Sequence, residues 1–412
     1  MPGPWPAYPD ARDGLDELDL GWLRARPGQK WARARAAGED VLACWVADMD
    51  FPTPAPVRAA LTRLAASGDV GYPDVHESHA LEPAWAQRMS SKFGWYPTTG
   101  RLRVFSDIIQ AVEAILHVMT APGDGVLLFT PSYPPFVEGL ATMGRRLVPV
   151  PALSSANGWQ FDLEAAEEGA RGARALLLVN PHNPTGRMLS EQELAVVAQM
   201  AERHDLLVIS DEVHADLTLA GRRHIPFASL TPALEARTVT LYSASKSHNL
   251  GGMRCAVAHM GNLEADRRLR ALPPKLLGRV SMAAVVATLA SWSEEGDQWL
   301  GQALERLRAN RSALSAWLSG VGAERGLRGH PPEGTYLCWL DFRATSIGGN
   351  EDPAQALVQD AGVLLSGGPA FGPGGTGFAR LNFATTPVVL EEILRRLARG
   401  LDRHQHELGE PL

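Results

Sequence analysis

The feature that most constrains how this chain folds is an alternation of short apolar runs with amphipathic helical patterns. Between the apolar runs at 175–180 and 206–210, Ser190 and Glu193 form a capping box, which predicts the start of a helix. Another amphipathic pattern begins just after Ser106. Strands that alternate with helices predict a mostly parallel sheet with helices on both faces. The runs of strand character are residues 126–130, 175–180, 206–210 and 238–243.

The pattern changes from residue 295 onward. A long helical stretch leads into the strand-like TYLCWLDF, then a Gly/Pro-rich loop, the strand-like ARLNFA and a final helix. This order predicts a second, smaller α+β domain, which the N-terminal arm completes. We predict an arm and part of the small domain at 1–62, a large α/β domain at 63–294 and the small C-terminal domain at 295–412.

Composition and charge exclude several classes of protein. The 412 residues include 39 Lys and Arg against 46 Asp and Glu, and this net charge of −7 argues against a nucleic-acid-binding domain. No apolar stretch is long enough to span a membrane, and we expect no signal peptide. Cys44, Cys255 and Cys338 are far apart, which excludes a disulfide framework and a CxxC metal site. We expect a cytoplasmic protein with buried thiols, no metal and no nucleic-acid or membrane partner.

Polar side chains follow four of the predicted strands at the point where each ends. They are Tyr133, Asn183, Asp211 and Lys246. In parallel sheets, functional groups gather at the carboxyl ends of the strands, so we expect these four to converge. Pyridoxal phosphate needs a lysine to bind it covalently and an acid to pair with its ring nitrogen. The four residues together therefore favour a site for this planar, phosphorylated cofactor.

The motifs around these residues resemble the fold-type I pyridoxal-phosphate enzymes of the class I/II aminotransferase family. The resemblance covers nearly the whole chain and rests on PSYPPF, VNPHNPTG, SDEVHADL and SASKSHNLGGMR. Within the family, WVADMDFPTP, GYPD, DEVHADL and EGTYLCWLD resemble the MalY/PatB-type cystathionine β-lyases. The resemblance implies the pyridoxal-phosphate-dependent transferase fold, an α/β architecture with a large domain and a smaller α+β domain.

The resemblance also implies roles for the four strand-end residues. Lys246 matches the lysine that binds the cofactor and moves the substrate proton. Asp211 matches the acid that keeps the ring nitrogen protonated, although an aspartate there also suits a helix N-cap. Asn183 would donate to the ring 3-hydroxyl oxygen, or else serve only the Asn-Pro turn. Tyr133 would stack on the ring, with a core tyrosine as the alternative.

The phosphate group requires several donors. By resemblance, Ser243 and Arg254 contact the phosphate. The helix that begins near Asp107 would add the backbone N–H groups of Ile108 and Ile109, because a helix N-terminus binds anions. Asp107 carries the wrong charge for a neighbour of phosphate, so the hydroxyl and the guanidinium are the stronger candidates.

Further residues complete the implied site. Arg380 matches the arginine that binds the α-carboxylate of the substrate. Asn183 and the backbone near Ala47 and Asp48 should also contact the substrate. Tyr72 resembles the tyrosine that reaches the partner subunit's phosphate, which implies a homodimer with a shared site. His214 stands where aminotransferases usually have a tyrosine. Two roles are open for it, a contact with the cofactor hydroxyl or packing behind the carboxylate.

Three functions are compared. The first is a carbon–sulfur β-lyase that converts an S-substituted cysteine into thiol, pyruvate and ammonia. The second is an aminotransferase or oxidative deaminase of an amino acid, and the third is a non-catalytic protein on the same fold. The complete set of Lys246, Asp211 and Arg254 argues against the third. The first two share the chemistry up to removal of the Cα proton, and the subfamily motifs favour the lyase.

Overall fold

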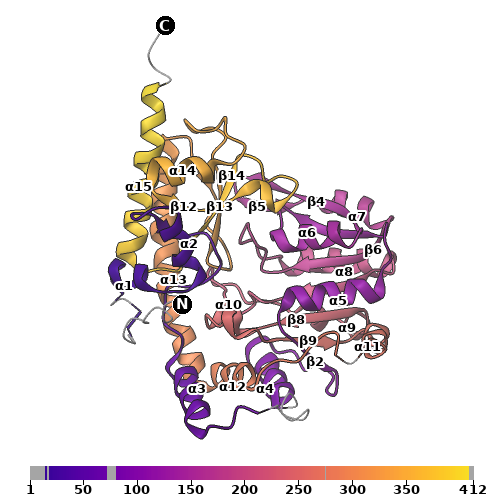
Figure 1. Ribbon diagram of the computed structural model, residues 1–412. Coiled ribbons are helices and arrows are strands. Elements are labelled where there is room, and N and C mark those ends of the chain that lie inside the picture. Colours follow the sequence, from indigo (N-terminus) through magenta and orange to yellow (C-terminus); the bar gives the residue numbers. More distant parts are fainter. Residues whose placement is uncertain (1–13, 16–17, 72–79, 274, 408–412) are drawn as a thin grey trace.

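The computed structural model describes residues 14–15, 18–71, 80–273 and 275–407. An eight-stranded sheet forms the centre of the larger part (Figure 1). Its order is β2-β9-β8-β7-β6-β3-β4-β5. Neighbours from β8 through β4 pair in parallel, whereas β2, β9 and β5 pair antiparallel with their neighbours. The strands are β2 (Leu102–Phe105), β3 (Gly125–Thr130), β4 (Arg146–Ser155), β5 (Gly158–Phe161), β6 (Ala173–Val179), β7 (Leu207–Asp211), β8 (Thr238–Tyr242) and β9 (Ala256–Met260).

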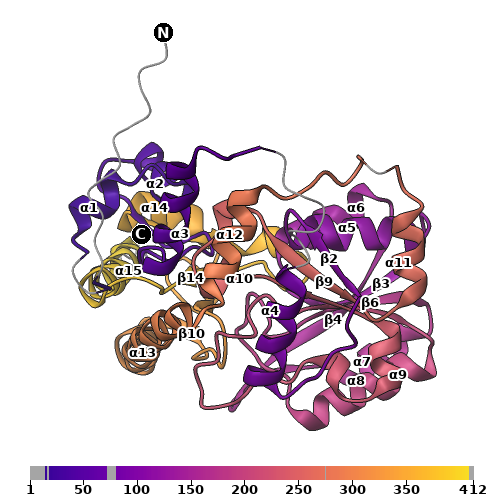
Figure 2. The same cartoon turned by 90° about the horizontal axis from the view of Figure 1, so that it is seen from below.

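Helices cover both faces of this sheet because its central strands are apolar on both sides. Successive residues of a strand point to opposite faces. Val126 and Leu128 of β3 pack with α5, α6 and α11, whereas Leu127 and Phe129 pack with α7 and α8 (Figure 2). The predicted mostly parallel sheet is therefore confirmed. These helices are α5 (Ile108–Met119), α6 (Pro134–Thr142), α7 (Leu163–Ala170), α8 (Glu191–Arg203), α9 (Pro232–Arg237) and α11 (Leu263–Arg270).

The helix starts follow from local hydrogen bonding. Ser190 and Glu193 form both bonds of the predicted capping box at α8. Asp107 caps α5, since its side chain accepts from Gln110 N. The remaining helices of the larger part are α3 (Ala55–Ser67), α4 (Leu81–Arg88), α10 (Ala244–Ser247) and α12 (Met282–Ser291).

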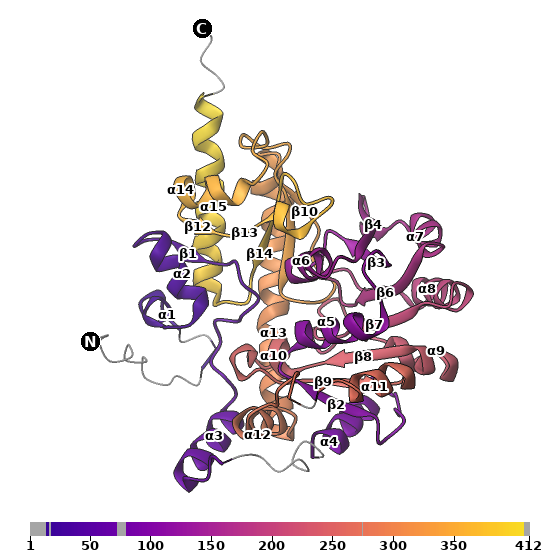
Figure 3. The same ribbon diagram turned by 45° about the vertical axis from the view of Figure 1, so that its right-hand side comes forward.

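The smaller part combines both ends of the chain. One hydrophobic core joins Leu23 and Trp31 with Leu340 and Leu397, and Figure 3 shows α1 and α2 beside α15. A four-stranded antiparallel sheet has the order β10-β11-β14-β13, and β1 pairs in parallel with β12. The domain boundaries at residues 62 and 295 stay predictions. The elements are α1 (Leu20–Ala25), α2 (Gln29–Ala37), α13 (Glu294–Trp317), α14 (Pro353–Ala361), α15 (Pro387–Glu407), β1 (Leu42–Ala43), β10 (Arg328–Gly329), β11 (Leu337–Asp341), β12 (Val363–Leu364), β13 (Ser366–Gly367) and β14 (Phe378–Asn382).

Two expectations from composition can be compared with this fold. The three cysteines are free and buried, as predicted. Within the described ranges, no helix has the length and apolar character needed to cross a membrane.

Candidate active site

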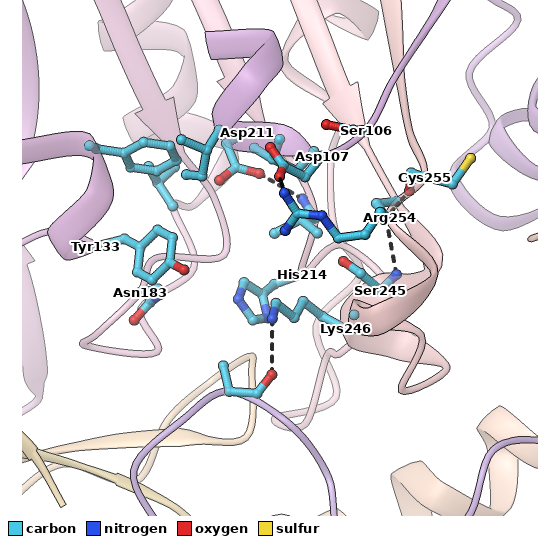
Figure 4. A pocket seen from close by; sticks show the side chains of 18 residues that line it. Ser106, Asp107, Tyr133, Asn183, Asp211, His214, Ser245, Lys246, Arg254 and Cys255 are labelled. Carbon is cyan, nitrogen blue, oxygen red and sulfur yellow. Dashed lines mark hydrogen bonds and ion pairs between the residues drawn. The ribbon is translucent and has the colours of Figure 1, made fainter. Parts of the chain in front are cut away.

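A pocket lies at the carboxyl ends of β3, β6, β7 and β8, where the sequence predicts the site. Its lining includes Tyr133, Asn183, Asp211, His214 and Lys246, which lie at or shortly after the ends of these four strands. Figure 4 shows these side chains around one open space, with Arg254 on its far side. The structure therefore brings together the four predicted strand-end residues.

Lys246 lies on the short helix α10 directly after β8. Its Nζ donates to the carbonyl oxygen of Ala47 at 3.0 Å, which fixes the direction of the amine. Burial lowers the pKa of Lys246, and the nearby carboxylates of Asp48 and Asp211 oppose this shift. A lowered pKa increases the share of neutral amine, the form that acts as nucleophile or base.

Asp211 is the last residue of β7, and it is buried. One carboxylate oxygen accepts from the backbone N–H of Val213 at 3.1 Å. Burial raises the pKa of Asp211 to about 7, and the neighbouring Glu212 adds to this rise while Lys246 opposes it. A buried carboxylate with so high a pKa lacks a close cation. A protonated ring nitrogen in the pocket would supply one.

His214 lies in the turn after β7 and is 2% exposed. Burial, with the positive charges of Lys246 and Arg380, lowers the pKa of His214 to about 3, so its imidazole is neutral at pH 7. Within the described chain its Nδ1 has no hydrogen-bond partner. A buried polar atom without a partner is costly. The pocket therefore suits a ligand with a polar group near this nitrogen, but the two roles open for His214 stay open.

Arg380 enters from β14 of the smaller part and is 4% exposed. It donates to Asn183 Oδ1 at 2.9 Å, to the carbonyl oxygen of Trp45 at 2.9 Å and to Ser366 Oγ at 3.2 Å. Burial lowers the pKa of Arg380 to about 10, so it stays charged. Among the described residues its hydrogen-bond partners are neutral, and its Nε has none. A buried guanidinium in this state is suited to a carboxylate.

The predicted phosphate end is arranged differently from the expectation at one residue. Ser243 donates its hydroxyl to the carbonyl oxygen of Cys255 at 2.6 Å and accepts from Ser245 N, so this hydroxyl already has partners within the protein. Arg254 forms an ion pair with Asp107. That contact explains an aspartate at this end of the pocket, because its charge is balanced by the arginine. The phosphate role of Ser243 stays a prediction.

Two groups of donors at this end remain available to an anion. Ile108 and Ile109 begin α5 and line the pocket, and the first N–H groups of a helix lack partners within it. Ser106 and Ser245 also line the pocket, and the sequence analysis missed both. Their signal was adjacency, since each lies one residue from a position already singled out. The donor set thus fits a phosphate.

One more residue of the site was not predicted, and another was predicted only through its backbone. Tyr336, the unpredicted one, is buried and donates its hydroxyl to the carbonyl oxygen of Ala47 at 2.8 Å. Asp48 was expected to border the substrate through its backbone, whereas it is its side-chain charge that acts on Lys246. Both belong to motifs quoted for the resemblance, which gave no role for their side chains. Tyr72 lies outside the described residues.

Comparison with known proteins gives matches over nearly the whole chain. The family described as "Aminotransferase class I and II" matches residues 45–397. The cystathionine beta-lyase of Corynebacterium glutamicum is 32% identical over 93% of this chain and 99% of its own length. The arginine–pyruvate transaminase AruH of Pseudomonas aeruginosa is 32% identical over 88% of this chain and 90% of its own. Cystalysin from Treponema denticola, in a crystal structure that contains pyridoxal 5′-phosphate, superposes with a TM-score of 0.85 and 26% identity, over 92% of this chain and 96% of its own.

These matches confirm three predictions from the sequence. The resemblance to the family and the fold-type I architecture are correct. The cofactor is pyridoxal 5′-phosphate. The individual residue roles stay predictions, although the pocket supplies a lysine, a buried acid and anion donors in one place.

Proposed function

We propose that this chain is a carbon–sulfur β-lyase of S-substituted cysteines. The chain belongs to the aminotransferase class I and II family and is a pyridoxal-phosphate-dependent enzyme. In the overall reaction the Cα–H, Cβ–S and Cα–N bonds break, and one water is consumed, which supplies the keto oxygen of pyruvate. The products are a thiol, pyruvate and ammonia. No oxo acid takes part, which separates this reaction from amino transfer.

The observation that carries the proposal is the segment 45–48, which lies between the two charged groups that an amino acid needs. The carbonyl oxygens of Trp45 and Ala47 accept from Arg380 and Lys246, respectively. An amino acid whose carboxylate pairs with Arg380 therefore has its Cα within reach of Lys246. This segment belongs to the WVADMDFPTP motif that resembles the lyase subfamily.

Each residue of the chain has a stated task in this proposal. Arg380 binds the α-carboxylate, Lys246 takes the Cα proton, and Asp211 holds a proton at the ring nitrogen. Pyridoxal phosphate supplies the electron sink that makes loss of this proton possible. Asn183 contacts the 3-hydroxyl oxygen and Tyr133 the ring face. Arg254, Ser243 and the N–H groups of Ile108 and Ile109 hold the phosphate.

The leaving group decides between the two reactions open to the site. A thiolate leaves readily, because the reference pKa of a cysteine thiol is about 8.5. Amino transfer instead requires a second proton transfer by Lys246 before the product is released. We propose that expulsion is faster with an S-substituted cysteine. Similarity to proteins named cystathionine β-lyases supports this choice.

The second candidate is an aminotransferase, or an oxidative deaminase, on the same residues. Similarity to a protein named arginine–pyruvate transaminase supports it. Both candidates use a homodimer in which Tyr72 of one subunit reaches the phosphate of the other.

The test is a panel of S-substituted cysteines, with cystathionine among them. We expect thiol, pyruvate and ammonia in equal amounts without any added oxo acid. Absence of thiol from every thioether, with turnover that depends strictly on an oxo acid, would establish the aminotransferase instead.

A further inference from the structure

In the proposed function residues 45–47 border the substrate, and Asp48 is the next residue of this segment. Along this segment the contact with Arg380 is at residue 45 and the contact with Lys246 is at residue 47. A substrate with its carboxylate at the first contact and its Cα at the second is aligned with the segment. In this alignment the substrate side chain beyond Cα would extend toward Asp48, the next residue of the segment.

The backbone of Asp48 accepts two hydrogen bonds from side chains, and the residue as a whole is partly exposed. Its carbonyl oxygen accepts from Asn382 Nδ2 at 2.7 Å and from Lys30 Nζ at 3.1 Å. The side chain lines a polar recess together with Arg26 and Asn249. The carboxylate is thus placed by the fold and remains open to a ligand.

A glycine shared by the recess and the pocket makes room for this carboxylate. Gly251 lines both cavities. A Cβ atom at this position would lie 3.2 Å from Asp48 Oδ1, whereas one at the neighbouring Gly252 would meet nothing within 4 Å. Asp48 itself lines the recess, and its carboxylate lies against a glycine that also lines the pocket.

The negative charge of Asp48 affects the pKa values of Tyr336 and Lys246. Burial is the main reason for the raised pKa of Tyr336, and Asp48 adds to it. Burial also lowers the pKa of Lys246, which Asp48 and Asp211 oppose and Arg380 and Arg254 reinforce. Asp48 is therefore close enough to act on a charge carried by the substrate.

We propose that Asp48 determines which substrate side chains the enzyme accepts, by disfavouring those that end in an anion and favouring those that end in a cation. This inference rests on the proposed function, because it requires an amino acid held by Arg380 and Lys246. Two unit charges a few ångströms apart near a protein surface interact strongly enough to change selectivity about tenfold or more. Neutral side chains are little affected.

The experiment compares three cysteine thioethers of similar size in the holoenzyme and in Asp48→Asn. They are S-(2-aminoethyl)cysteine, S-methylcysteine and S-carboxymethylcysteine, whose side chains are cationic, neutral and anionic. We expect the kcat/KM ratio of the cationic to the anionic substrate to fall about tenfold or more in Asp48→Asn. Asp48→Glu should keep most of the ratio. Asp205→Asn is the matched control, because it removes the same charge from a side chain that is 88% exposed at the opposite end of β7.

A second readout does not depend on turnover. The visible absorbance of the resting holoenzyme is titrated with pH. Loss of the negative charge should lower the apparent pKa of the Lys246 group in Asp48→Asn but not in Asp205→Asn. The charges around that group are Asp48, Asp211, Arg380 and Arg254.

Two outcomes would overturn the inference. One is an unchanged selectivity ratio in Asp48→Asn, and the other is an equal change in Asp205→Asn. Turnover is followed as consumption of the amino acid, so the ratio is measured whether the products come from elimination or from amino transfer. Failure of the lyase proposal, which is absence of thiol, is therefore separate from failure of the role of Asp48.

Discussion

Arg380, Lys246 and Asp211 share one property, which is that burial works against their charges. Burial lowers the pKa of Arg380 to about 10 and that of Lys246 below its usual value, and it raises the pKa of Asp211 to about 7. Buried charges are costly unless they are paired. In the proposed function, a zwitterionic substrate and a cationic ring nitrogen would provide the missing partners, and binding would relieve costs that the folded chain carries alone.

The residue that tests this idea is Asp211. Its folded-state pKa is raised, so the native state retains a proton that the unfolded state has lost between about pH 4 and pH 7. The contribution of Asp211 to the stability of the cofactor-free protein is therefore present at low pH and is lost as the pH rises through about 7. We predict that Asp211→Asn removes this loss. At pH 7.5 the cofactor-free variant should be about 2–4 kcal/mol more stable than the wild type.

The measurement is urea denaturation of both cofactor-free proteins at pH 5 and pH 7.5. Buried His182, His214 and His248 have lowered pKa values and act in the opposite direction. Because both proteins contain them, the difference between the two isolates Asp211. In the holoenzyme the same variant should lose activity mainly in kcat. A stability difference that does not change with pH would contradict the prediction.

Sequence patterns revealed the residues whose position follows from the fold class, and missed those that depend on distant contacts. Lys246 and Asp211 could be located because each directly follows an apolar strand. The contact of Tyr336 and the side-chain role of Asp48 could not be predicted, because they depend on the hydrogen bonds of Ala47 with Lys246 and Tyr336, which are far away in the chain. The partner of the Ser243 hydroxyl was equally unreadable.

At the scale of elements, a buried ionic network joins the ends of two strands to two helices. Arg88, the last residue of α4, donates to Tyr242 Oη at 2.6 Å, to Asp216 at 2.9 Å and to Asp297 of α13 at 2.8 Å. Tyr242 also donates to Asp216. Tyr242 precedes the loop that carries Lys246, and Asp216 follows His214. The network therefore ties together the two loops that form the floor of the site.

We predict that Arg88→Met destabilises the holoenzyme by about 3–5 kcal/mol, because it leaves the buried carboxylate of Asp216 without its cation. The matched control is Arg203→Met. Arg203 also pairs with a carboxylate, but its side chain is 56% exposed, so the cost should be about 0–1 kcal/mol. Urea denaturation measures both. Equal effects of the two substitutions would show that the network contributes no more than a surface pair.

The helices and strands that could be predicted are those whose sequence signal is local. The buried strands β3, β6, β7 and β8 and the capped helix α8 were evident from apolar runs and a capping box. The pairing of β1 with β12 was not, because Leu42 meets Val363 across most of the chain. Two-residue strands carry no periodic signal.

At the scale of the whole molecule, three distant segments build one site. Ala47 comes from the N-terminal segment, Lys246 from the larger part and Arg380 from the smaller part. The hydrogen bond between Arg380 and Asn183 crosses between the two parts. If Arg380 binds the substrate as proposed, substrate binding depends on the relative position of these parts.

The proposed homodimer extends this dependence to a second subunit and gives the last prediction. If Tyr72 acts on the partner's phosphate, then each site uses Lys246 of one subunit and Tyr72 of the other. In a mixed dimer of Lys246→Ala and Tyr72→Phe, both defects then fall in the same site. Each variant alone should be strongly impaired. When the two are unfolded and refolded together, a mixed dimer has one site with neither defect, built from Lys246 of the Tyr72→Phe chain and Tyr72 of the Lys246→Ala chain. Activity should therefore reappear on mixing.

If Tyr72 acted within its own chain, both sites of every mixed dimer would stay defective and mixing would restore nothing. Light scattering on the same samples checks assembly, and full activity of a monomer would refute the shared site.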